Sequence, residues 1–176
     1  MIEIKTERLL LRDWRDEDLP AWTAINADPE VREYLGPVWD EAQSAASMVK
    51  YQEAYQRNGF SFWAVESLAT GELLGLAGLD PVEPEVPFDG IEIGWRLARS
   101  AWGKGYASEA ALAALDFGFR TAGLAEIFAI TLAGNVRSQA VMTRVGMTHV
   151  PERDFVYHET PGDEGYQHVV WSKKAA

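Results

Sequence analysis

The chain has no cysteine among its 176 residues, which excludes a disulfide framework, thiol catalysis and cysteine-ligated metal sites. Its three histidines, His149, His158 and His168, show no metal-ligand spacing, so the sequence predicts no metal site. Basic residues are few: 16 against 27 acidic ones, a net charge of −11. This balance argues against a nucleic-acid partner held through its phosphates and would attract a cationic one, although acidity can also serve solubility alone.

Long apolar runs are also missing, and the N-terminus lacks a cationic stretch followed by an apolar core. We therefore expect a soluble, cytoplasmic protein that does not enter a membrane. The chain contains no repeat and no flexible linker, and its 47% hydrophobic content can bury one substantial core. These features predict a single domain over residues 1–176.

Hydrophobic periodicity predicts a mixture of strands and helices. Helices are expected around Leu19–Ile25 and over 40–56, 106–120 and 135–146, and strands within 2–14, 60–67, 73–79, 91–97, 126–132, 147–156 and 166–172, the last two flanking an acidic loop at 159–164. Strand, helix and strand within about forty residues, from 91 onward, indicate a parallel crossover. The expected fold is α/β (α+β), with a mixed, mostly antiparallel sheet of about seven strands and helices on both faces.

The most informative motif is the glycine-rich segment between strand 91–97 and helix 106–120. It reads Gly103-Lys104-Gly105-Tyr106-Ala107-Ser108. Its glycines remove the Cβ atoms that would keep a phosphate from the main chain, and the first amides of the helix point at an anion. The P-loop pattern is absent, and serine at 108 replaces the third glycine of a dinucleotide fingerprint. A diphosphate ligand is implied, although glycine can also serve only to reverse the chain.

Several segments occur in a specific order and spacing across nearly the whole chain, namely Thr6–Arg12, Ile91–Trp95, Trp102–Ala110, Asn135–Ser138 and Val145–Met147. Together they resemble the GNAT superfamily of acyl-CoA-dependent N-acetyltransferases, most closely its ribosomal-protein N-terminal acetyltransferase (RimJ/RimL) branch. The resemblance implies transfer of an acetyl group from acetyl-CoA to a primary amine, of a protein N-terminus or a small molecule, by a monomer or homodimer. A non-catalytic acyl-CoA-binding module, and an enzyme using another donor such as succinyl-CoA, remain alternatives.

The resemblance also implies a coenzyme A site. The glycine-rich loop would bind the pyrophosphate, and pantetheine would lie along strand 91–97 and accept its backbone hydrogen bonds. The implied binding residues are Trp95, Arg96, Leu97, Trp102, Gly103, Lys104, Gly105, Tyr106, Ala107, Ser108, Asn135 and Ser138. Because Trp102 stands where relatives often have Arg or Gln, the positive charge must come from Lys104 or from arginines nearby.

Met142 stands where many relatives carry a tyrosine that protonates the leaving thiolate, and a thioether cannot donate a proton. Ser138 matches the serine of RimL-type enzymes, so the resemblance makes it the candidate acid. Asn135 and Ser138 can equally be an N-cap and a first-turn residue.

Glu92 is the candidate base, because its side chain leaves the strand on the face opposite Ile91 and Ile93. The alternative is a structural glutamate paired with Arg96. Gly94 predicts a bulge that would bring backbone amides of residues 94–97 to the thioester carbonyl. Among the tryptophans, we expect Trp14 and Trp63 in the core and Trp39 in the cleft.

Overall fold

The computed structural model describes residues 1–158 and 164–175, so the acidic loop expected at 159–164 lies outside the described residues except for Glu164. The helices are α1 (Leu19–Ala27), α2 (Pro29–Arg32), α3 (Glu41–Asn58), α4 (Tyr106–Arg120) and α5 (Val136–Arg144), with 3-10 turns η1 (Asp16–Asp18), η2 (Arg99–Ala101) and η3 (Pro151–Arg153). The strands are β1 (Ile4–Lys5), β2 (Leu9–Arg12), β3 (Phe62–Ser67), β4 (Leu73–Pro81), β5 (Ile91–Leu97), β6 (Glu126–Leu132), β7 (Thr148–His149), β8 (Phe155–Tyr157) and β9 (Tyr166–Lys174).

The described strands form a single sheet in the order β1-β2-β3-β4-β5-β6-β9-β7, with β8 also paired to β9. Among the described strands only the β5–β6 pair is parallel, so the predicted mixed, mostly antiparallel fold is confirmed. In the described part of the chain the sheet has nine strands rather than about seven. One reason is that the strand expected over 147–156 is divided into β7 and β8 by η3, which begins at Pro151, a residue without a backbone N–H to donate to a ladder.

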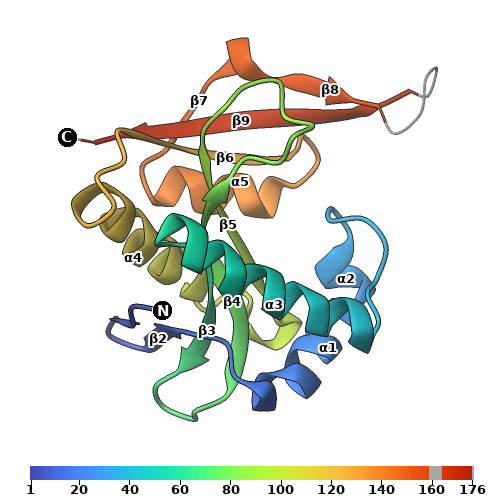
Figure 1. Cartoon of the computed structure of the whole chain (residues 1–176). Coiled ribbons are helices and arrows are strands. Elements are labelled where there is room, and N and C mark those ends of the chain that lie inside the picture. Colours follow the sequence, from blue (N-terminus) through green and yellow to red (C-terminus); the bar gives the residue numbers. More distant parts are fainter. Residues whose placement is uncertain (159–163, 176) are drawn as a thin grey trace.

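Helices cover both faces of the sheet, and each face has its own core. The larger core joins α4 and α5 to side chains such as Leu79, Ile93 and Ile127. The smaller core joins α1 and α3 to Leu76. Figure 1 shows α3 passing in front of the strands. Trp14 and Trp63 are 4% and 0% exposed, so the prediction that both are core residues is confirmed.

Two helix starts differ in how they are capped. The Asp40 carboxylate accepts a hydrogen bond from the Gln43 amide, and the Gln43 side-chain oxygen accepts one from the Asp40 amide, which is a capping box at the start of α3. Asp18 stands at the N-cap of α1 but makes no side-chain cap; it binds Arg12 with both carboxylate oxygens, at 2.8 and 2.7 Å. These hydrogen bonds, working against burial, raise the pKa of Arg12. The buried pair fixes β2 against η1.

The register of β4 and β5 decides which side chains share the face covered by α1 and α3. Three cross-strand pairs lie in successive rows on that face, and these are Leu76 with Arg96, Gly78 with Gly94, and Asp80 with Glu92. The β4–β5 register is continuous, so the bulge predicted at Gly94 is absent from this ladder. A Cβ atom on Gly94 would instead lie 3.0 Å from the Phe62 ring, so a larger residue here would require that ring to shift.

Strands β5 and β6 separate almost at once. Their parallel ladder consists of one pair, Glu92 with Phe128, although each strand has seven residues. The residues of β5 that follow Glu92 therefore have no partner strand on the β6 side, and a gap opens between the two strands. None of the helices in the described part of the chain is long and apolar enough to cross a bilayer.

Candidate active site

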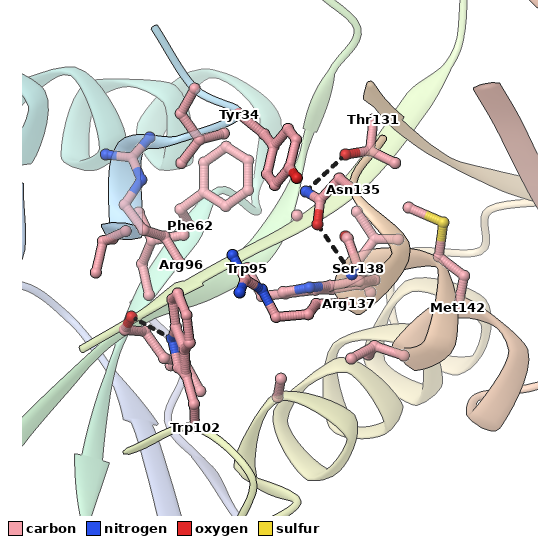
Figure 2. Close-up of a pocket in the computed structure, with 18 of the residues that line it drawn as sticks. Tyr34, Phe62, Trp95, Arg96, Trp102, Thr131, Asn135, Arg137, Ser138 and Met142 are labelled. Carbon is pink, nitrogen blue, oxygen red and sulfur yellow. Dashed lines mark hydrogen bonds between the residues drawn. The ribbon is translucent and has the colours of Figure 1, made fainter. Parts of the chain in front are cut away.

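A cleft of about 1070 Å³ begins at the gap between β5 and β6. Its walls come from the α2–α3 region, β3, β4, β5, the loop before α4 with the first turn of that helix, the end of β6, and α5. Figure 2 shows Trp95, Trp102, Arg137 and Ser138 converging on it from three different elements. All but one of the predicted binding residues line this cleft, and the exception is Lys104.

The glycine-rich loop has the geometry that an anion site requires. Gly103 and Gly105 have φ angles of 73° and 82°, in the left-handed region that favours glycine. Gly105 is the N-cap of α4, and the Ser108 hydroxyl three residues later is buried and has no hydrogen-bond partner. An unpaired buried hydroxyl beside the free amides of a helix N-terminus fits a phosphate group well.

Arg8, about a hundred residues earlier in the chain, binds this loop. Its guanidinium donates to both the Glu109 carboxylate, at 2.7 Å, and the Lys104 carbonyl, at 2.9 Å, and stacks on the Tyr106 ring. Partial burial alone would raise the pKa of Glu109, but hydrogen bonds from Thr6 and Arg8 outweigh it and lower that pKa. Lys104 is thus held by Arg8 through its carbonyl, and it does not line the cleft.

Trp102 stands between two arginines. The guanidinium carbons of Arg99 and Arg137 lie 4.9 and 4.6 Å from the centre of a Trp102 ring. Both arginines also pair with glutamates of the α2 segment, Glu30 and Glu33 respectively. Arg99 and Arg137 are therefore the candidates for the positive charge expected near the loop; Arg99 precedes Gly103 by only four residues, whereas Arg137 lies on a separate helix that no local pattern connects to the glycine motif.

The Leu97 carbonyl, predicted to hold pantetheine, already accepts a hydrogen bond from the Trp102 indole at 2.9 Å. One lone pair of that oxygen is left for a ligand. The backbone groups of β5 that face β6 and are still free to bind a ligand therefore lie nearer Trp95 than Leu97.

Asn135 and Ser138 both line the cleft, at the start of α5. The Asn135 side chain accepts a hydrogen bond from the Ser138 amide at 3.2 Å and donates one to Thr131 at 3.0 Å (Figure 2). Asn135 is therefore a true N-cap of α5. Ser138 lines the cleft, and in the described structure its hydroxyl forms no side-chain hydrogen bond. Met142 is buried one turn further along and has no polar hydrogen to offer.

Glu92 lines the cleft at the point where β5 and β6 part. Burial raises the pKa of its carboxyl to about 7, and the nearby carboxylates of Glu83 and Asp80 add to the rise. The alternative pairing with Arg96 is wrong, because Arg96 donates to Asn26 at 2.6 Å. A carboxyl that changes charge near neutral pH can take up a proton there.

Arg96 and the aromatic side chains form the other end of this face. The guanidinium of Arg96 stacks on Trp22 and Trp39, and that of Arg32 stacks on Trp39 as well. Trp39 lines the cleft, as predicted. The ring of Phe62 lies over the glycine row, between the rows of Arg96 and Glu92.

The fold and the site together identify the class of protein. Residues 8–148 match the family model of the acetyltransferase (GNAT) domain, and the chain belongs to this family. YoaA of Bacillus subtilis (strain 168), an uncharacterised N-acetyltransferase, is 28% identical over 171 residues, covering 95% of this chain and 96% of the relative. An acetyltransferase of the GNAT family from Bacillus anthracis is 28% identical, covers 98% of both chains and has a TM-score of 0.83.

A third neighbour bears on the predicted RimJ/RimL resemblance. RimL, a ribosomal L7/L12 alpha-N-protein acetyltransferase solved with coenzyme A, superposes with a TM-score of 0.80 at 17% identity, over 99% of this chain and 98% of its own. This likeness is one of fold, and at that level the predicted resemblance is confirmed. The protein is an acyl-CoA-dependent acetyltransferase that transfers an acyl group to an amine.

Proposed function

We propose that the protein transfers an acetyl group from acetyl-CoA to a primary amine, of a protein N-terminus or a small molecule, by direct attack in a ternary complex. Glu92 acts as the general base and Ser138 as the general acid. The observation that carries this proposal is the place of Glu92, a half-buried residue at the opening between β5 and β6 whose desolvated carboxyl has a pKa of about 7.

The residues at the N-terminus of α4 fit a pyrophosphate. The amides of 103–108 and the free Ser108 hydroxyl would bind it, and Arg99 and Arg137 would supply positive charge. The backbone of β5 around Trp95 would bind pantetheine on its unpaired side. Acetyl-CoA supplies the activated acyl group. In the described structure no three acidic or histidine side chains are placed to hold a metal ion, and the proposal uses none.

Glu92 is suited to remove the proton that the attacking amine must lose. An α-amino group has a pKa near 8 and a lysine amine near 10.4, so a base is needed more for the second than for the first. A carboxylate with a pKa of about 7 is a stronger base than an ordinary glutamate and is still largely ionised above that pH. The C–N bond forms as the C–S bond breaks, and Glu92 holds the amine proton.

Ser138 is suited to protonate the departing thiolate. It lies on the first turn of α5, and the Asn135 cap holds its backbone in place. Its hydroxyl is free to donate, whereas Met142 cannot donate at all. The proton lost by the serine is replaced from solvent through the open cleft.

The test is release of free thiol from acetyl-CoA in the presence of peptides, polyamines and aminoglycosides, with succinyl-CoA as a second donor. Turnover of acetyl-CoA with one acceptor class is the expected result. Acyl-CoA binding without turnover of any amine would contradict the proposal. Faster turnover of succinyl-CoA would contradict the choice of acetyl donor but leave the roles of Glu92 and Ser138 intact.

A further inference from the structure

Asp80 lies directly opposite Glu92. The two residues are cross-strand partners in the β4–β5 ladder, so their side chains leave the sheet on the same face, with Cβ atoms about 5 Å apart. Both line the cleft. Like charges placed opposite each other destabilise a sheet, so this pair needs a reason other than stability.

Asp80 has no partner for its charge. The residue is 8% exposed, and its Oδ1 atom is buried without a hydrogen bond. Lys50, the nearest cation, pairs with Glu83 at 3.1 Å and is more than half exposed. Among the described residues, the Asp80 carboxylate forms neither an ion pair nor a hydrogen bond. Leaving a buried carboxylate unpaired is costly, which points to a cation that arrives from outside.

The local charge is unbalanced. Three carboxylates, those of Asp80, Glu83 and Glu92, face one ammonium, that of Lys50. Arg96 is two rows away, bonded to Asn26, with the Phe62 ring between. Of the other charged or titratable groups, Tyr51 and Arg57 of α3 interact electrostatically with Asp80, and Arg153 stacks on Phe128, the β6 partner of Glu92. Two positive charges would balance the ionised site.

We propose that Asp80 and Glu92 select a diamine as the acceptor: one amine reacts beside Glu92, and a second ammonium group is bound between Asp80 and Glu83. This inference rests on the proposed function, because it assigns Glu92 to the reacting amine. Because the two carboxyl groups stand on facing Cβ atoms about 5 Å apart, we expect a diamine with a short alkyl spacer. Asp80 is a specificity residue and takes no part in the proton transfer.

The site makes binding depend on pH in a defined direction. Burial, with the Glu83 carboxylate adding to it against the attraction of Lys50, raises the pKa of Asp80 to about 6, and that of Glu92 is about 7. A bound diammonium favours the ionised forms, so it lowers both pKa values and releases protons. Diamine affinity should therefore increase as pH rises from 6 to 8, while the amines themselves stay charged.

The experiment compares putrescine with n-butylamine, which has the same carbon chain and one amine fewer. Calorimetry measures binding to the coenzyme A complex at pH 6 and pH 8, and thiol release gives kcat/KM. The variants are Asp80→Asn and, as a matched control, Asp89→Asn, an exposed aspartate outside the cleft. Acetyl-CoA affinity and thermal unfolding of each variant are measured alongside.

We expect wild-type protein to prefer putrescine, with affinity rising with pH. Asp80→Asn should reduce the putrescine preference by about tenfold or more, the effect of losing one charge-assisted hydrogen bond, and should unfold at a temperature no lower than wild type. Asp89→Asn should change neither the putrescine preference nor the unfolding temperature. Equal kcat/KM for the two amines, or putrescine affinity independent of pH, would overturn the diamine site and leave the proposed function standing.

Acetyl-CoA binding without turnover of any amine would instead overturn the proposed function. If Asp80→Asn does not fold, Asp80 is structural and the inference is wrong. The pH dependence of putrescine binding to wild-type protein is an independent check of the diamine inference.

Discussion

Replacing Glu92 with glutamine should make the protein more stable and less active at the same time. Glu92→Gln keeps the size of the side chain but removes its negative charge. In the folded protein burial raises the pKa of Glu92 from the ordinary 4.5 to about 7. The folded state therefore binds this proton more tightly than the unfolded state, and wild-type stability falls as pH rises from about 4.5 to about 7.

The size of this effect follows from the pKa. One pKa unit corresponds to about 1.4 kcal/mol, so the ionised Glu92 costs the folded protein up to about 3 kcal/mol above pH 7. Glutamine carries no such cost. Glu92→Gln should thus raise the unfolding temperature by roughly 6–12 °C at pH 8, and the difference should vanish near pH 4, where the carboxyl is neutral in both states.

Activity should change in the opposite direction. Loss of a positioned general base typically costs about a hundredfold or more in rate. The defect near pH 7 should be larger for lysine-like amines than for α-amines, since a smaller fraction of them is neutral, and it should partly recover at high pH.

Thermal unfolding between pH 4 and pH 9 and initial rates of thiol release measure the two effects. Glu85→Gln, the same change at an exposed glutamate, is the control and should alter neither. A stability gain with full activity toward both amine types at pH 7 would show that Glu92 is buried but is not the base. Unchanged stability at pH 8 would refute the raised pKa itself.

Three further predictions follow from the loop, the acid and the buried pair. Gly105→Val puts a branched side chain at a φ of 82° and should abolish coenzyme A binding in calorimetry, and wild-type affinity would exclude the loop as the phosphate site. Ser138→Ala should lower kcat with little change in acetyl-CoA affinity, whereas lost binding would indicate a structural role. Asp18→Asn should leave the buried Arg12 with Glu66 as its remaining carboxylate partner and cost about 1.5–3 kcal/mol in denaturant unfolding; Glu17→Gln, next to it but 75% exposed, should cost almost nothing.

Local pattern was enough to predict the parts of the molecule that depend on neighbouring residues. The alternation of β5 separated Glu92 from Ile91 and Ile93 correctly, and α4 has the predicted bounds. The left-handed glycines at 103 and 105 were also predictable, because a strand, a tight turn and a helix leave the chain few other conformations. The resemblance to the GNAT family added how coenzyme A would lie between the glycine-rich loop and β5, which local pattern alone could not supply.

Tertiary structure decided which side chains meet across the chain. Arg8 braces a loop about a hundred residues away, and Arg137 reaches Trp102 from a separate helix. No periodicity in the sequence encodes such contacts, since they depend on how the elements pack.

Strand register likewise decided which side chains meet at the acidic end of the cleft. It placed Asp80 opposite Glu92, and a slip of one residue would have turned one of them to the other face. Arg96, two residues beyond Gly94, pairs with Asn26 of α1 rather than with the glutamate on its own strand. The sequence by itself therefore determined the fold, the glycine-rich loop and the strand face that carries Glu92. The partners of these residues were decided by packing, because each contact joins segments that only the folded sheet brings together.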